Sequence, residues 1–300
     1  MWVLLGICSA VLLGFYEVGR KHAVNDNAVI PVLLGSTLFG ALLVVPVIAL
    51  SKITPLAMQN WGLYVPVLPL DAHIYLIIKA VIVASSWTMG FFALKHLPIS
   101  IFTPIRATSP FWTLIGAILI FHEQPSAMQW AGLILILLSY YAFTLIGNQE
   151  GISFHRNKWI YMLILETIIG SLSGLYDKQL IQKLGFTPIV VLTWFSFYIV
   201  LIFLILSLVL WYPQRKTSTP FQWRWSIPLV GIFLVFSDFL YFRALSYSAA
   251  LIVLVIAVRR LNVVISFLIG SFWFKEVNKR IKLLALSGVL AGIFLLVLSS

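Results

Sequence analysis

Residues 187–211, TPIVVLTWFSFYIVLIFLILSLVLW, hold no charged side chain over a length that can cross a lipid bilayer. A membrane-spanning α-helix needs about 20 apolar residues, and backbone groups in lipid must hydrogen-bond within the segment. This stretch therefore predicts a transmembrane helix. The rest of the 300-residue chain has the same character, because 61% of its residues are hydrophobic and only 10% are charged. A soluble domain carries about 25% charged residues.

Ten stretches meet the same length criterion, and turn or helix-breaking residues such as Asn25-Asp26-Asn27, Pro98 and Pro188 separate them. The stretches lie at about 2–20, 28–50, 72–94, 98–121, 127–147, 159–182, 187–211, 226–246, 248–274 and 283–299. We therefore predict an all-α membrane protein with ten transmembrane helices, located in the cell membrane.

The chain contains a repeat. Gly14-Phe15-Tyr16-Glu17 closes the first span, and Gly174-Leu175-Tyr176-Asp177 closes the sixth. Polar residues of the fourth span also recur in the ninth at constant spacing. The aligned pairs are Arg106 with Arg259, Ser109 with Asn262, Thr113 with Ser266, and Glu123 with Glu276. We expect two five-helix repeats, 1–150 and 151–300, and an odd number of spans in each forces them into opposite orientations. Inverted repeats are typical of secondary transporters, with the substrate site at their interface.

Acidic residues follow spans four and nine, in Phe121-His122-Glu123 and Phe274-Lys275-Glu276. With ten spans in two halves, the sequence resembles the drug/metabolite transporter superfamily, EamA-like branch, over essentially its whole length. The resemblance implies a basket of ten helices around a central cavity, and export or exchange of small metabolites. The pair Arg259-Arg260 is more basic than expected for an amino-acid exporter. It is similar in place and type to the basic pair that organic-phosphate translocators of the superfamily carry on this helix.

Charged residues inside the spans are the candidates for function. Each costs at least about 2.5–3.5 kcal/mol at a helix centre unless it is paired or hydrated. The basic ones outnumber the acidic ones. The charged residues inside the spans are Glu17, Arg20, Lys79, Arg106, Glu166, Asp177, Lys178, Asp238, Arg243, Arg259 and Arg260.

We expect Arg106, Arg259 and Arg260 to bind an anion, because the guanidinium fork matches carboxylate and phosphate oxygens. Ser109 shares a helical face with Arg106, and Asn262 shares one with Arg259. The alternative is that the arginines neutralise acidic residues across the cavity.

The acidic candidates are Glu17, Asp177 and Asp238. Besides pairing with arginines, Glu17 and Asp177 could bind a cationic amine or carry a coupling proton. The aromatic candidates for the cavity wall are Trp87, Tyr176 and Tyr241.

These residues predict a secondary transporter of a small polar metabolite by alternating access. The substrate is expected to be anionic or carboxylate-bearing: an amino acid, an organic acid or an organic phosphate. A lipid or amphiphile flippase and a cationic drug exporter of the same fold are the alternatives. No nucleotide-binding, metal-binding or hydrolase motif occurs, so neither an enzyme nor a cofactor is expected.

The expected partners are the small-molecule substrate and the lipid bilayer. The net charge of +11 lies mostly in loops, which points to membrane orientation rather than to nucleic acid. By the positive-inside rule both termini are outside, whereas the family resemblance suggests that both are inside. Gly288 and Gly292 on the last span predict internal helix packing, and we expect a monomer or a weak homodimer.

Overall fold

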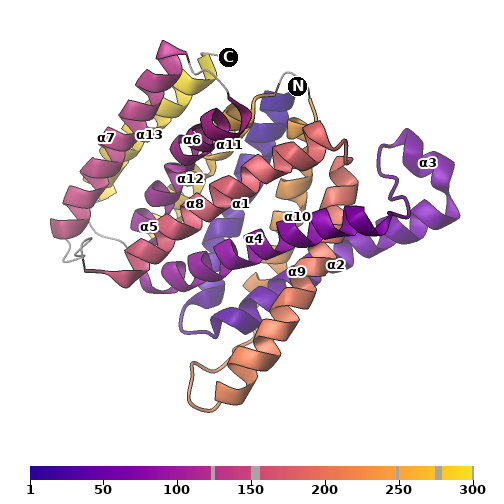
Figure 1. The fold of residues 1–300 in the computed structure, drawn as a ribbon. Helices are drawn as coiled ribbons and strands as arrows, with labels where there is room; N and C mark the ends of the chain where they lie inside the picture. Colours follow the sequence, from indigo (N-terminus) through magenta and orange to yellow (C-terminus); the bar gives the residue numbers. More distant parts are fainter. Residues whose placement is uncertain (123–125, 150–155, 248–249, 274–278, 299–300) are drawn as a thin grey trace.

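The computed structural model describes residues 1–122, 126–149, 156–247, 250–273 and 279–298, and these residues form helices and no strand (Figure 1). Eight helical stretches of the described residues are long and apolar enough to cross a membrane, and two of them, Ile101–Phe121 and Ile252–Ile269, each run over two consecutive helices. The chain is therefore a multi-pass membrane protein. Two more helices, α7 and α13, hold shorter apolar stretches, Ala127–Ser139 and Leu286–Leu295. The count of ten spans therefore stays a prediction.

Thirteen α-helices make up the described chain. The first half contains α1 (Trp2–Val24), α2 (Val29–Ile53), α3 (Pro55–Asn60), α4 (Leu70–His96), α5 (Ile99–Ala107), α6 (Ser109–Phe121) and α7 (Ala127–Gln149). The second half contains α8 (Lys158–Lys178), α9 (Pro188–Leu206), α10 (Ser226–Leu245), α11 (Ile252–Arg259), α12 (Asn262–Trp273) and α13 (Lys279–Leu298). A π-helical turn extends α8 over Gln179–Lys183 and another extends α9 over Ser207–Trp211, followed by a 3₁₀ turn at Tyr212–Gln214.

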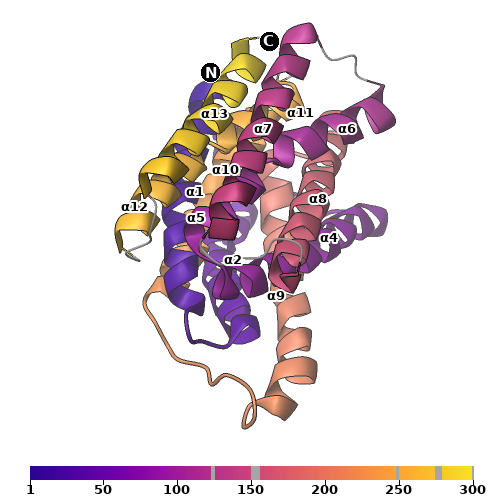
Figure 2. The ribbon, with the colours of Figure 1, turned by 90° about the vertical axis from the view of Figure 1, so that its left-hand side faces the viewer.

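The helix pairings respect the repeat. α1 packs on α10, and the equivalent helix α8 packs on α4. α2 likewise packs on α10, and its equivalent α9 packs on α4, while α2 with α9 and α7 with α13 pair across the two halves. Both views show α7 and α13 side by side at the edge of the bundle, and both termini at the same end (Figures 1 and 2). Exchanging the two halves therefore reproduces the main pairings, as a repeat in space requires.

Spans four and nine were expected to be continuous helices, and each is broken instead. The fourth span divides at Thr108 into α5 and α6. Pro110 accounts for this break, because proline has no N–H to donate to the carbonyl of Arg106 and its ring crowds that carbonyl. The ninth span divides at Arg260 and Leu261 into α11 and α12. Here the Leu261 N–H donates to the Val258 carbonyl at 3.0 Å, a 3₁₀-type bond that tightens the chain.

The half-helices cross in a reciprocal way. α5 packs on α12, and α6 packs on α11, which is the arrangement of two antiparallel broken helices that cross near their breaks. Arg106 ends α5, while Arg259 and Arg260 lie at the end of α11. The crossing therefore brings the three predicted arginines to one region in the interior of the bundle.

Four of the motif residues quoted above lie outside the described residues. Glu123, Lys275 and Glu276 belong to this group, as does Phe274. The boundary predicted between residues 150 and 151 also lies outside them.

Small residues set the closest helix contacts. On α13, a Cβ added at Gly292 would lie 2.6 Å from the Gly132 carbonyl of α7, so Gly292 serves the internal packing predicted for it. Gly40 of α2 faces Gly231 of α10 in the same manner, with an added Gly40 Cβ 3.4 Å from the Gly231 carbonyl. A Cβ at Gly231 would overlap the Ser36 carbonyl and lie 2.9 Å from the Gly40 nitrogen.

We predict that Gly231→Ala destabilises the fold by about 1–3 kcal/mol, the range for overpacking against atoms that cannot move aside. The matched control is Gly19→Ala, whose Cβ would meet only the Val230 methyl Cγ2 at 3.2 Å. Thermal unfolding of the purified protein in detergent measures both. Equal losses for the two variants would contradict the close backbone approach of α2 and α10.

Candidate functional site

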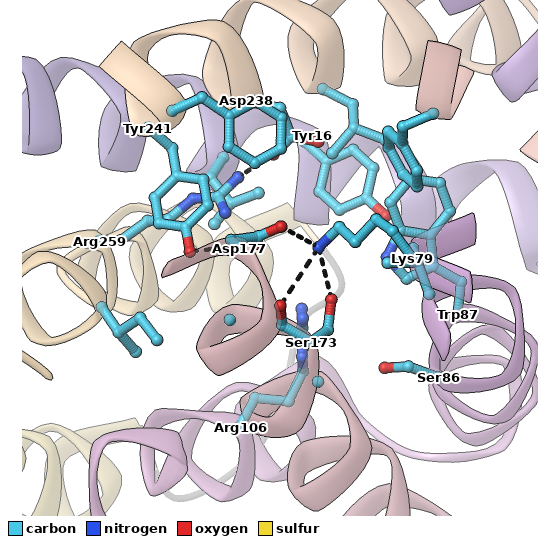
Figure 3. Close-up of a pocket in the computed structure, with 18 of the residues that line it drawn as sticks. Tyr16, Lys79, Ser86, Trp87, Arg106, Ser173, Asp177, Asp238, Tyr241 and Arg259 are labelled. Carbon is cyan, nitrogen blue, oxygen red and sulfur yellow. Dashed lines mark hydrogen bonds and ion pairs between the residues drawn. The ribbon is translucent and has the colours of Figure 1, made fainter. Parts of the chain in front are cut away.

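A cavity that is partly open to solvent lies among α1, α4, α5, α8, α9, α10 and α11, and the empty space there is about 790 Å³ when the adjoining open solvent is included. Figure 3 shows the side chains that surround it. Its polar and aromatic lining consists of Tyr16, Lys79, Ser86, Trp87, Arg106, Ser173, Asp177, Phe195, Asp238, Tyr241, Phe242, Arg259 and Arg260. The cavity thus combines a wall of rings with charges of both signs.

Most of the residues expected at the site line this cavity. They are Arg106, Arg259, Arg260, Asp177, Asp238, Trp87 and Tyr241. Glu17, Ser109 and Asn262 do not: each is buried within the helix packing, with at most 2% of its surface exposed. Tyr176 lies elsewhere, with its hydroxyl donating to the Tyr75 carbonyl at 3.2 Å, so we leave it out of the proposed site.

A buried charge cluster borders one side of the cavity. Glu17 is fully buried and pairs with two cations, Arg106 and Arg20, the latter at 3.4 Å. Arg106 also reaches Glu166 with its Nε at 3.0 Å. The residues come from α1, α5 and α8, so the cluster joins both halves of the chain. Arg106 therefore has the role of the alternative prediction from the sequence: it neutralises a carboxylate, Glu17, in this structure.

Arg20 is fully buried within the same cluster, although the sequence identified it only as one of the charged residues inside the spans. Aromatic rings surround its guanidinium, with Cζ 4.1 Å from the centroid of Phe91 and 5.1 Å from that of Phe102. Cation–π contacts of this kind stabilise a desolvated guanidinium. Arg20 is thus a fixed counter-ion for Glu17, and its Nε and Nη2 atoms have no hydrogen-bond partner among the described residues.

On the cavity wall, Asp177 of α8 pairs with Lys79 of α4 at 2.6 Å. The Lys79 ammonium also donates to the Ser173 hydroxyl at 2.6 Å, and the Tyr241 hydroxyl donates to Asp177 at 3.2 Å (Figure 3). Asp177 was expected to pair with an arginine, if with any residue. Its partner is a lysine that was not among the predicted site residues, although a lysine deep in an apolar span was a visible signal.

A separate ion pair joins Arg259 of α11 to Asp238 of α10. The guanidinium of Arg259 also stacks over the Tyr241 ring, 4.4 Å from its centroid. Tyr241 therefore contacts Arg259 with its face and Asp177 with its hydroxyl. The pairing of Arg259 with Asp238 is the second case in which a predicted anion-binding arginine already holds a carboxylate.

Arg260 differs from the other two arginines. It is half-buried, and its Nε donates to the Ser109 hydroxyl at 2.5 Å. Among the described residues no carboxylate forms an ion pair with it. We use 'cavity region' for the charged residues that line the cavity together with those joined to them by ion pairs. Its described part therefore holds five cations, Arg20, Lys79, Arg106, Arg259 and Arg260, against four carboxylates, Glu17, Glu166, Asp177 and Asp238.

Residues that correspond by sequence take different partners in space. Glu17 aligns with Asp177, and Arg106 aligns with Arg259. Glu17 and Arg106 form an ion pair, but the equivalent pair is absent here because Asp177 holds Lys79 and Arg259 holds Asp238. Tyr16 lines the cavity whereas its counterpart Tyr176 does not. The two halves therefore adopt different local states.

Metal binding finds no support within the described ranges, where no three His, Cys, Asp or Glu side chains gather as ligands would. The site's chemistry is that of ion pairs, hydroxyl groups and rings. It can bind and orient a charged molecule.

These features define a polytopic membrane protein with a charged, partly open cavity between two related halves. The model of the EamA-like transporter family matches residues 1–145 and 157–298, and the chain belongs to this family. A solved structure, described only as "Crystal structure of protein", shares the fold with a TM-score of 0.67 and 15% identity, over 99% of this chain and 97% of the other. No curated protein sequence matches the chain.

We predict that Arg106→Gln destabilises the protein by about 3–5 kcal/mol, the range for leaving a buried carboxylate without its partner. Glu17 keeps Arg20, but Glu166 loses the only cation that pairs with it among the described residues. The double variant Arg106→Gln/Glu166→Gln should recover much of the loss, because no charge is then left alone. Thermal unfolding measures both, and a double variant no more stable than Arg106→Gln would contradict the assignment.

Proposed function

We propose that this protein is a secondary transporter, an exporter or exchanger, of a small polar metabolite that carries an anionic group. In this proposal the chain works in the cell membrane as a monomer or weak homodimer. The regions 1–150 and 151–300 are the two halves that move, and substrate binds in the cavity between them. No enzymatic step and no cofactor is part of the proposal.

The observation that supports an anion is the state of Arg260. Four cations of the cavity region are paired with carboxylates, and Arg260 contacts only the Ser109 hydroxyl among the described residues. An unbalanced charge in a membrane interior is costly. A substrate anion would balance it, through a charge-assisted hydrogen bond worth about 1.5–3 kcal/mol. A cationic substrate would instead add to the excess.

The mechanism we propose is an exchange of ion-pair partners between the two halves. In inverted repeats, the opposite-facing state is reached when each half adopts the conformation of the other. Glu17 and Arg106 would then separate, and their counterparts Asp177 and Arg259 would pair. Tyr241 already contacts both Asp177 and Arg259, so the new pair can form over a short path.

The charge preference is tested by ligand-induced stabilisation. Amino acids, organic acids, sugar phosphates, nucleotides and the lipophilic cation tetraphenylphosphonium are screened by thermal shift. We expect an anion to stabilise the wild-type protein, by about 2.7 kcal/mol at a concentration 100 times its Kd. Arg260→Gln should abolish this effect. Arg156→Gln, the same change at an exposed position, should keep it.

The opposite pattern would overturn the proposed charge preference. In that case tetraphenylphosphonium stabilises the protein, Arg260→Gln leaves the effect intact, and Asp177→Asn removes it. The cationic drug exporter would then be the better assignment for the same cavity.

The exchange of partners is tested with a double-mutant cycle on Asp177→Asn and Arg259→Gln. We expect the two changes to be coupled in counterflow by reconstituted vesicles, with the double variant no slower than the worse single variant. In thermal unfolding of the resting protein the coupling should be weaker than on counterflow, because the two residues form no ion pair in this structure and share only the contact with Tyr241. Asp177→Asn with Arg156→Gln is the control cycle. Additive effects on counterflow would rule the exchange out.

A further inference from the structure

We infer that the substrate is a monocarboxylate of net charge −1 with an aromatic or similarly bulky apolar body, rather than a zwitterionic amino acid or an organic phosphate. The inference rests on the proposed function and narrows it. Two observations carry it: the charge balance around Arg260 and the rings that line the cavity.

The charge balance selects the net charge of the ligand. The described part of the cavity region holds one more cation than carboxylates. One negative charge completes the balance. A phosphate monoester carries about −1.5 to −2 at neutral pH and would leave an excess of negative charge next to Glu17, Glu166, Asp177 and Asp238. Beside these four carboxylates, such an excess is disfavoured by repulsion between like charges.

The ammonium group of an amino acid would find no free partner. Asp177 is held by Lys79 and by the Tyr241 hydroxyl, and Asp238 is held by Arg259. The remaining two carboxylates of the region, Glu17 and Glu166, lie buried against Arg106. Binding a zwitterion would require one of these pairs to open, whereas a monocarboxylate leaves all of them in place.

Arg260 offers the geometry that a carboxylate needs. A guanidinium has five N–H donors, and among the described residues only the Nε–H of Arg260 has an acceptor, the Ser109 hydroxyl at 2.5 Å. The terminal Nη1 and Nη2 atoms can therefore donate to both oxygens of one carboxylate. The bond to Ser109 fixes the plane of the guanidinium and so the direction of approach.

The cavity walls select the body of the ligand. Tyr16, Trp87, Phe195, Tyr241 and Phe242 line the same space as Arg260. Trp87 stands edge-on to Phe195, with ring centroids 5.9 Å apart. Three of the four hydroxyl groups in the lining, those of Ser86, Ser173 and Tyr241, already form hydrogen bonds within the protein. This argues against a sugar, whose many hydroxyl groups need hydrogen-bond partners. Aromatic walls beside a few polar groups are typical of sites for ring-containing ligands.

A ladder of ligands with one common ring tests the net charge. The probes are 3-phenyllactate (−1), phenylalanine (0), 2-phenylethylamine (+1), and phenylsuccinate and phenyl phosphate (about −2), with binding measured on the purified full chain by calorimetry. We expect 3-phenyllactate to bind at least about tenfold more tightly than each of the others. Arg260→Gln should erase its advantage over phenylalanine, and Arg260→Lys should recover only part of it. Arg156→Gln should change nothing.

Lactate, which has the same head group without the ring, tests the body of the ligand. Trp87→Leu should weaken 3-phenyllactate and leave lactate unchanged. If lactate binds as well as 3-phenyllactate, or if 3-phenyllactate does not bind, the inferred body is wrong.

The failure of this inference is distinguishable from that of the proposed function. If phenyl phosphate or phenylsuccinate binds most tightly and depends on Arg260, the anion transporter stands and the monocarboxylate is wrong. Tightest binding of phenylalanine likewise refutes the −1 charge alone. If 2-phenylethylamine binds most tightly and Arg260→Gln has no effect, the monocarboxylate inference and the proposed anion transporter are both wrong.

Discussion

The cost of placing charges inside a membrane governs the interior of this protein. Each charged side chain there must find a counter-charge, an aromatic face or water. Lys79 finds Asp177, Arg259 finds Asp238, and Arg106 shares Glu17 and Glu166. The broken helices serve this need, because their crossing places Arg106, Arg259 and Arg260 around one space. Among the described residues, the compensation of charge is therefore left incomplete at the cavity, where no carboxylate pairs with Arg260.

The helical fold was predictable because it depends on the length of apolar runs and on a repeat that the sequence displays openly. The sequence aligned Arg106 with Arg259, and in the structure their spans pack together, α5 on α12 and α6 on α11. The breaks in these spans were not predicted. Pro110 was a visible signal for the first, but proline is tolerated within many membrane helices. The second break, at Arg260 and Leu261, contains no proline, and only the hydrogen bonds of the folded chain reveal it.

The site was predictable in its residue types and less so in its partners. Seven of the predicted side chains line the cavity, together with Tyr16 and with Lys79, which the sequence placed only among the charged residues of the spans. A repeat in sequence gives equivalent residues equal weight, so Tyr16 and Tyr176 could not be distinguished. In one conformation of an inverted repeat the halves differ, and Tyr16 faces the cavity while Tyr176 contacts Tyr75. Ion-pair partners were beyond prediction for the same reason, since they depend on which half is in which state.

The aromatic enclosure of Arg20 has a consequence for the rate at which the ion pairs around Glu17 can rearrange. A buried carboxylate that loses its only cation is a high-energy species, and it would act as a barrier to movement. Glu17 escapes this, because Arg20 stays beside it, held by Phe91 and Phe102 rather than by a second acid. Asp177 has a similar reserve in the Tyr241 hydroxyl and Lys79. Glu166 has no second cation among the described residues, so the separation of Arg106 from Glu166, and not from Glu17, would set the activation energy for any movement of Arg106.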